Sequence, residues 1–453
     1  MPLPRRLPLA LLLSASLLCL DAGVAAASEA ATARPYSPDE VVVRYAPRAG
    51  EAARSAVERA AGARNQRSFA PRTGVVRIRD GDSVPETIAQ LESREAVISA
   101  TPNWTARLAA TTFPDDPGRI DTAGGWRELQ WNLLPPFGID APTAWENLIR
   151  AGRGGGRGVV VAVLDTGVAY RDLGRFKRSP DLSPHRFVAG YDFVERDRYP
   201  LDHNGHGTHV ASTIAETAHN GIGVTGIAYG ARIMPVRVLD RNGEGDGVDI
   251  AAGIRLAARR GADVLNLSVE FDPSVTIRDI PEIAEALRYA RRRGTLVVAA
   301  SGNSERRTVA FPARAESVLS VGATTEHGCQ ADYSNYGSDL DLVAPGGGED
   351  ADLPLEADRC RPFEPRGRGI YQMTYAGSIR RFALRADTGT SMASPHVAAV
   401  AALVIASRVL GRDPSPGAVE AHLKATATDL GPAGVDRRYG AGLVNAGRAT
   451  APR

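Results

Sequence analysis

Lysine is almost absent from this 453-residue chain. Only Lys177 and Lys424 occur, so arginine supplies almost all of the positive charge, and the formal net charge is +2. The arginines are scattered among acidic residues and form no basic stripe interleaved with aromatic side chains. We therefore expect no nucleic-acid partner. The 43% hydrophobic content suffices for a sizeable core and for more than one domain.

The N-terminus has an apolar stretch that is too short to cross a bilayer comfortably. This leucine-rich stretch, residues 7–20, follows Arg5 and Arg6 and precedes the small-residue sequence "AGVAAAS", which fits signal peptidase cleavage. We therefore expect a signal peptide over residues 1–27, with a retained anchor as the alternative. The mature protein would be secreted, with a periplasmic location also open, and would not be bound to a membrane after signal cleavage.

Few cysteines remain once the signal peptide, with Cys19, is removed. They are Cys329 and Cys360. In an oxidising compartment two cysteines can pair, so we expect one disulfide that ties residues 346–387 to the rest of the chain. Two unpaired buried thiols are the alternative.

Two blocks follow the signal peptide. Over residues 28–105, strand-like and helix-like segments alternate in the order β-α-β-α-β, which predicts a small α+β domain. Residues 106–125 are rich in Ala, Thr, Gly, Asp and Pro, lack periodicity, and indicate a linker.

Residues 126–453 contain continuous apolar runs such as "GVVVAVLDTG" and "GTLVVAASGN", separated by helical segments such as "DGVDIAAGIRLAARRGA". This pattern indicates a parallel sheet covered on both faces, so the expected fold is a doubly wound α/β sandwich. Active sites in such sheets lie at the carboxyl ends of strands.

Three polar residues stand out at these ends. Asp165 closes an apolar run, His206 lies between two glycines in "NGHGTHVAS", and Ser391 opens a long segment that is apolar on every side. Pro395 predicts a helix start close to it, because proline is tolerated in a helix's first turn. A serine needs a base to become nucleophilic, and the base needs a carboxylate to hold its tautomer, so the three residues together indicate nucleophilic catalysis.

Other function classes lack their signatures. The chain has no H-E-x-x-H, although His206, His209 and nearby Asp202 leave a zinc hydrolase as an alternative. Ser391 stands in "GTSMA" and not in the G-x-S-x-G of α/β-hydrolases. An inactive binding protein on the same scaffold would be expected to have lost one of these residues, and none is lost.

Several motifs resemble those of the subtilisin-like serine peptidases, the subtilases. "VAVLDTGV", "NGHGTHVAS" and "GTSMASPHVA" are similar to the three signature blocks, and further similarity extends the resemblance over residues 130–446. The preceding α+β block resembles the family's inhibitory propeptide. The resemblance implies a secreted, self-processing serine endopeptidase and a monomer, with peptide substrates and its own propeptide as partners and without a catalytic metal or organic cofactor.

The resemblance also implies a role for each matching residue. Asp165 would orient the imidazole, His206 would act as general base and then acid, and Ser391 would attack the scissile carbonyl. Asn303, in "AASGN", matches the amide that stabilises the oxyanion.

A calcium site is a further implication of the resemblance. "AHNGIGVTGIA" is similar to the family's calcium loop, and Asp172 in "YRDL" matches the carboxylate that completes it; Gln130 is a second candidate. The alternative is an ordinary glycine-rich turn. The expected structural ligands from this loop are Ala218, Asn220, Ile222 and Val224.

The resemblance also implies that substrate binds extended against the strand "NLSVEF". Where subtilases usually continue with small residues, Val269, Glu270 and Phe271 follow here. A deep pocket would give broad, mainly hydrophobic specificity with some tolerance of basic residues, and Glu270 could instead select arginine. The expected substrate-binding residues are Ser268, Val269, Glu270, Gly302 and Ala310.

Overall fold

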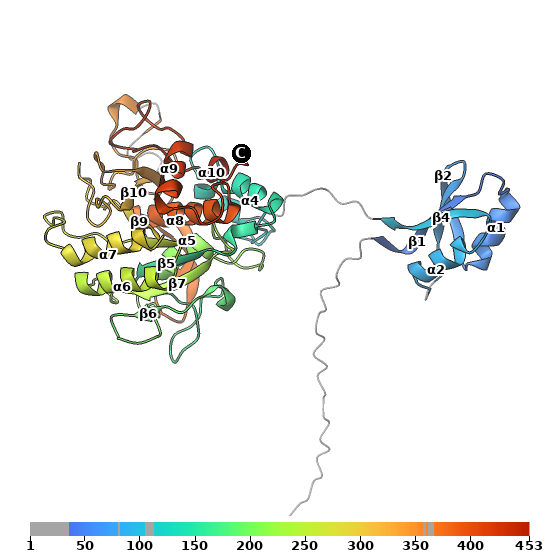
Figure 1. The fold of residues 1–453 in the computed structure, drawn as a ribbon, viewed down its shortest axis with the longest axis horizontal. Helices are drawn as coiled ribbons and strands as arrows, with labels where there is room; N and C mark the ends of the chain where they lie inside the picture. The colour runs from blue at the N-terminus through green and yellow to red at the C-terminus, as the bar shows by residue number, and fades with distance from the viewer. Residues whose placement is uncertain (1–35, 80–81, 105–112, 357–358, 361–366, 453) are drawn as a thin grey trace, which may run out of the picture. The chain divides into compact units, whose positions relative to one another are not determined.

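The computed structural model describes residues 36–79, 82–104, 113–356, 359–360 and 367–452 in two compact units (Figure 1). The first unit ends at Ala110 and the second runs from Thr111 to Arg453. The predicted signal peptide lies outside the described residues.

The first unit is a four-stranded antiparallel sheet with two helices, which confirms the expected α+β class. The sheet order is β2-β3-β1-β4. The predicted β-α-β-α-β order lacked one strand, "RNQRSFA". The sequence did not indicate this strand because it is mostly polar, and it lies at the sheet edge, where it pairs with the next strand of its hairpin. The elements are β1 (Tyr36–Tyr45), α1 (Glu51–Ala60), β2 (Arg64–Ala70), β3 (Thr73–Arg77), α2 (Val84–Glu92) and β4 (Val97–Trp104).

The second unit is built on a seven-stranded sheet in which all neighbouring strands are parallel, in the order β11-β10-β9-β8-β5-β7-β6. The order reverses direction around β5, as expected for a doubly wound sheet. The strands are β5 (Val160–Asp165), β6 (Tyr191–Asp192), β7 (Arg232–Arg237), β8 (Val264–Leu267), β9 (Leu296–Ala300), β10 (Val318–Thr324) and β11 (Leu342–Pro345).

Helices cover both faces of this sheet and divide the core in two (Figure 1). Along β5, Val161 and Val163 pack with α4, α5 and α8, whereas Ala162 and Leu164 pack with α6 and α7. The strand is therefore apolar at every position because each face meets a helix layer. The helices are α3 (Trp126–Leu129), α4 (Ala141–Arg150), α5 (His206–Ala215), α6 (Gly247–Arg259), α7 (Pro281–Arg292), α8 (Thr390–Ser407), α9 (Pro416–Thr426) and α10 (Ala446–Ala449), with short 3-10 turns at Trp131–Leu133, Gly154–Gly156, Pro184–Arg186 and Pro354–Glu356.

Part of the predicted linker, residues 106–125, belongs to the second unit. Its described part is residues 113–125. The Asp116 carboxylate is fully buried and accepts the backbone N–H groups of His219 and Asn220, and Gly118 N–H donates to the Gly223 carbonyl. The sequence pattern did not reveal this because the segment is held by hydrogen bonds and not by a periodic apolar face.

The expected disulfide is confirmed. Cys329 and Cys360 are joined, both are buried, and their Cα atoms lie 5.5 Å apart. In the chain-entropy model a loop of this size gives about 3–4 kcal/mol of stability. The bonded segment leads into a hairpin of β12 (Ile370–Tyr375) and β13 (Phe382–Asp387) that the sequence did not predict.

Helix α8 runs through the middle of the second unit and contacts α5 and five strands of the sheet. Its length and apolarity alone would allow it to cross a membrane, but 83% of the segment is buried inside the fold. Pro395 lies at the sixth helical position, so its predicted place in the first turn is wrong. Because proline has no N–H, the Ser391 carbonyl loses its helical partner and instead accepts the Ser268 hydroxyl at 3.1 Å.

Candidate active site

Asp165, His206 and Ser391 meet at the carboxyl edge of the large sheet. Asp165 is the last residue of β5 and is fully buried, His206 is the first residue of α5, and Ser391 is the second residue of α8. Glycines make this approach possible. Gly205 has a φ of 115°, and a Cβ on Gly207 would lie 2.1 Å from the Gly167 carbonyl oxygen.

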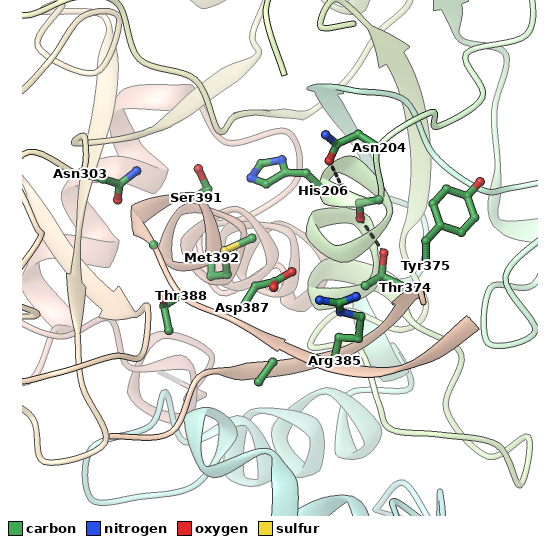
Figure 2. A pocket seen from close by; sticks show the side chains of 13 residues that line it. Asn204, His206, Asn303, Thr374, Tyr375, Arg385, Asp387, Thr388, Ser391 and Met392 are labelled. Carbon is green, nitrogen blue, oxygen red and sulfur yellow. Dashed lines mark hydrogen bonds between the residues drawn. The ribbon is translucent and has the colours of Figure 1, made fainter. Parts of the chain in front are cut away.

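The His206 imidazole is held at one nitrogen. Its Nδ1 lies 2.7 Å from Asp165 Oδ1, and the same carboxylate oxygen accepts the Thr166 N–H at 2.7 Å. The ring points toward the Ser391 hydroxyl, which comes from a segment far away in the sequence (Figure 2). Ser391 Oγ lies 3.5 Å from the Ser268 carbonyl oxygen. The arrangement gives a carboxylate, an imidazole and a hydroxyl in the order that proton transfer from serine needs.

The charges around His206 favour its protonated form. Burial alone lowers the pKa of His206, but the charge and hydrogen bond of Asp165, with the charges of Asp202 and Asp387, outweigh burial and raise the pKa to about 9. The side chain is still 30% exposed, so a substrate can reach it.

Asn303 lies on the other side of Ser391 (Figure 2). Its Oδ1 accepts two hydrogen bonds from Thr390, from N–H at 2.8 Å and from the hydroxyl at 2.9 Å. These bonds orient the amide, and its Nδ2 has no hydrogen-bond partner among the described residues. The Ser391 N–H lies in the first turn of α8, where backbone donors have no helical acceptor. Two donors are thus available for a developing negative charge beside Ser391.

Asp202 has a role that sequence reasoning missed. This fully buried carboxylate accepts hydrogen bonds from Asn204, Gly205 and Thr208 backbone N–H groups and from the Thr208 and Thr166 hydroxyls. It therefore fixes the turn that presents the imidazole. Its position two residues before "NGHG" was the available signal.

His209 turns away from His206 into the core. It is fully buried, and its Nε2 lies 2.9 Å from the Ile370 carbonyl oxygen. The zinc alternative required the rings of His206 and His209 to converge on one metal ion. The two rings instead contact different residues, Asp165 and Ile370.

The profile of the Subtilase family matches residues 156–442, which include all three residues of the site. The chain belongs to the subtilase family. It is a subtilisin-type serine protease, a peptide hydrolase, and it carries an N-terminal prodomain, since residues 22–103 match the description "Fervidolysin N-terminal prodomain".

Known subtilases resemble this chain at 31–41% identity. M-protease of Shouchella clausii is 41% identical over 65% of this chain, and the match spans 65% of M-protease. Subtilisin Savinase of Lederbergia lenta is 40% identical over 65% of this chain and 91% of its own length. A solved protease structure from Pseudoalteromonas arctica, 31% identical, aligns with a TM-score of 0.59 over 74% of this chain and 98% of that chain.

The expected substrate residues of this subtilase do not all share one pocket. Ser268, Val269, Glu270 and Gly302 line a pocket of about 370 Å³ together with Asn303 and Ser391. Ala310 is the exception, because it lines a neighbouring pocket. A Cβ on Gly302 would meet both the Ala310 Cβ, at 3.1 Å, and Glu270 Oε2, so Ala310 and Glu270 both pack closely against Gly302.

Glu270 is exposed in this pocket, and its Oε2 accepts the Asn303 backbone N–H at 3.1 Å. This bond holds the carboxylate beside Asn303, in a pocket that also contains the apolar Val269 and Phe271.

The structure places the carboxylate of Asp181, and not that of the predicted Asp172, against the loop. Asp172 Oδ1 accepts the Arg178 N–H, whereas the carboxylate on the loop is Asp181. Asp181 Oδ1 accepts the Asn220 amide at 2.7 Å and its Oδ2 accepts the Val224 N–H at 3.2 Å. Asp is followed by Leu both in "YRDL" and in the nearby "SPDL", and the earlier of the two matches misled the interpretation.

The rest of the loop is placed as follows. Asn220 Oδ1 accepts the Ile222 N–H, and Gln130 exchanges two hydrogen bonds with the Thr225 backbone. Ala218 begins the same loop, and two residues separate it from the end of α5.

Three buried carboxylates surround this loop: Asp116, Asp181 and Glu216. Burial raises the pKa of Asp181 to about 8, and burial together with the charge of Asp181 raises the pKa of Glu216. Glu216 Oε2 is buried without a hydrogen-bond partner in the described part of the chain. In the described part of the chain these three carboxylates do not converge into one metal-binding cluster, so a cation here would be held by Asp181 together with Asn220 and loop carbonyls, oxygen ligands that a hard cation prefers.

Proposed function

We propose that this subtilase is a secreted endopeptidase that cuts peptide bonds through Asp165, His206 and Ser391. The observation that carries the proposal is the imidazole of His206, bonded to Asp165 at 2.7 Å and directed at the Ser391 hydroxyl. His206 Nε2 takes the hydroxyl proton as Ser391 attacks the carbonyl, and then gives it to the leaving amine. A water molecule then attacks the acyl-enzyme with His206 again acting as base and acid, and Ser391 is released.

Asn303 Nδ2 and the Ser391 N–H stabilise the oxyanion of the tetrahedral intermediate. Both donors are fixed before substrate arrives, the amide by Thr390 and the N–H by α8. Preorganised donors of this kind stabilise the charge that forms only in the transition state.

A serine-reactive inhibitor tests this chemistry. A fluorophosphonate should abolish peptide hydrolysis and add its mass to the peptide that contains Ser391, whereas a zinc chelator should leave the catalytic step intact. Labelling of another residue, or loss of turnover with the zinc chelator alone, would contradict the proposed mechanism and favour a metal hydrolase.

We propose further that the protein is made as a self-processing zymogen. The prodomain would inhibit the second unit until Ser391 cuts the connection, and the predicted signal peptide, residues 1–27, would export the chain to the medium or to a periplasm. The processed enzyme would act as a monomer.

Specificity is proposed to be broad and mainly hydrophobic on the acyl side, with tolerance of basic residues. Val269 and Phe271 give apolar walls, and the Glu270 carboxylate supplies a partner for a cation. Profiling cleavage of a peptide library tests this. A strict demand for arginine that disappears in Glu270→Gly would make Glu270 the specificity determinant.

The raised pKa of His206 predicts an alkaline pH profile. The base must be neutral to accept the serine proton, so kcat/KM should increase with pH and level off above an apparent pKa of about 9. The activity must increase with pH, and not decrease, because carboxylates beside the imidazole stabilise its protonated, inactive form. A plateau already reached at pH 7, typical of an ordinary histidine, would contradict this.

We propose that a structural calcium ion binds the loop through Asp181, Asn220 and the carbonyls of Ala218, Ile222 and Val224. The ion would supply the positive charge that Asp181 and its buried neighbours Asp116 and Glu216 lack. It would thereby hold the loop to the segment that contains Asp116.

Chelation of calcium should therefore lower the melting temperature, on the order of 5 °C. Asp181→Asn should abolish this calcium-dependent shift, and Asp172→Asn, the matched control nearby, should keep it. A melting temperature that does not respond to chelation, with no calcium in the purified protein, would refute the site.

A further inference from the structure

The hairpin of β12 and β13 forms one wall of a second pocket at the active site (Figure 2). This pocket has a volume of about 590 Å³ and is lined by His206, Asn303 and Ser391 together with Arg385 and Asp387 of β13. It shares Ser391 and Asn303 with the pocket that contains Glu270, so the two pockets meet at the reacting serine.

The two pockets belong to opposite halves of a bound substrate. The strand end at Ser268 and Glu270 lines only the first pocket, and His206 lines only the second. In the proposed reaction His206 gives its proton to the leaving amine, so the leaving half of the substrate must pass His206. The hairpin wall therefore faces the residues that follow the scissile bond.

Asp387 is the charged side chain of this wall that lies nearer to the serine. Its side chain is 40% exposed, and its Oδ2 lies 3.9 Å from Nε2 of the buried His209. In the described part of the chain no arginine or lysine forms an ion pair with it. Figure 2 shows Asp387 between Met392 and Arg385, with Arg385 farther from Ser391.

The Asp387 charge reaches the reacting centre, because it is among the charges that raise the pKa of His206. Arg385 lies two residues earlier on the same strand, hence on the same face, and lines the same pocket without closing an ion pair with Asp387. A carboxylate that is accessible, that has no arginine or lysine partner among the described residues, and that lies next to the path of the leaving chain will bind a cation there.

We propose that Asp387 selects a cationic side chain at the first position after the scissile bond. This inference rests on the proposed peptidase function and goes beyond it, because it assigns a specificity residue to the leaving half of the cleft. Lysine or arginine at that position pairs with Asp387, and glutamate is repelled. Arg385 lies farther along the path of the leaving chain, where its positive charge favours an anionic substrate side chain.

The test compares three peptides that differ only in the first residue after the cut, which is lysine, glutamine or glutamate. For the processed enzyme, kcat/KM should be about five to ten times higher for the lysine than for the glutamate peptide, as expected for a partly exposed charge pair. Asp387→Asn should bring this ratio to within about twofold, each value being normalised to the glutamine peptide of the same variant. Arg381→Gln, on the same hairpin but outside the pocket, should keep the ratio.

The outcomes separate the two claims. If none of the three peptides is cut, the proposed peptidase function fails. If all three are cut with equal efficiency, or if the ratio survives Asp387→Asn, the function stands and the assignment of Asp387 is overturned. A ratio that collapses in Arg381→Gln as well would also overturn it, because the effect would then come from the overall charge.

Discussion

Ser391→Ala should yield a folded protein that hydrolyses no peptide and keeps its prodomain attached. The only atom removed is the hydroxyl oxygen that attacks the carbonyl, and kcat should fall about 10⁶-fold, the magnitude measured on subtilisin, a member of this family. Maturation should stop as well, because the same hydroxyl is proposed to cut the connection between the two units. Intact-mass analysis of protein from a protease-deficient host measures the processing, and a peptide hydrolysis assay on the same protein measures the activity.

A matched control lies on the same helix. Ser407→Ala removes a hydroxyl that donates to the Val404 carbonyl at the far end of α8. It should leave processing and activity at wild-type levels. Normal processing in Ser391→Ala under the same conditions would show that another protease, or another residue, performs the cut.

Asn303→Ala should lower kcat by about 10²–10³, again the magnitude measured on subtilisin, with little change in KM. The reason is that Nδ2 binds the oxyanion, which exists only after the attack, so ground-state binding does not use it. Steady-state kinetics on the processed enzyme separates the two parameters.

Alanine also removes the Oδ1 acceptor of the two Thr390 bonds, so a second variant is needed. Asn303→Asp retains Oδ1 for Thr390 and replaces the Nδ2 donor by an oxygen. Its kcat should fall at least as far. A kcat within about threefold of wild type in Asn303→Asp, or a rise in KM alone, would refute the oxyanion assignment.

The three proposed catalytic residues could be found from the sequence because each breaks the pattern of its own segment. Asp165 ends an apolar run, His206 stands between glycines that a close approach requires, and Ser391 opens a helix with no polar face. Such local violations are visible without coordinates. The strands of the large sheet were equally visible as continuous apolar runs.

What the sequence could not reveal depends on long-range pairing. Asp172 and Asp181 occur in similar local sequences, and only the fold brings Asp181 to the loop that begins at Ala218. Ala310 was expected to line the same pocket as Ser268 and Gly302, but the structure places it in a neighbouring pocket. The packing of Asp116 and the hairpin that carries Asp387 likewise have no periodic signal.

The separation of Asp165, His206 and Ser391 along the chain has a consequence for synthesis. A growing chain contains the carboxylate and the imidazole long before it contains the hydroxyl, which arrives on a helix near the C-terminal end. That helix must then pack through the middle of a sheet whose strands pair over long distances, which is slow. A growing chain that still lacks this helix therefore lacks the proposed nucleophile, and we expect any truncation before Ser391 to hydrolyse no peptide.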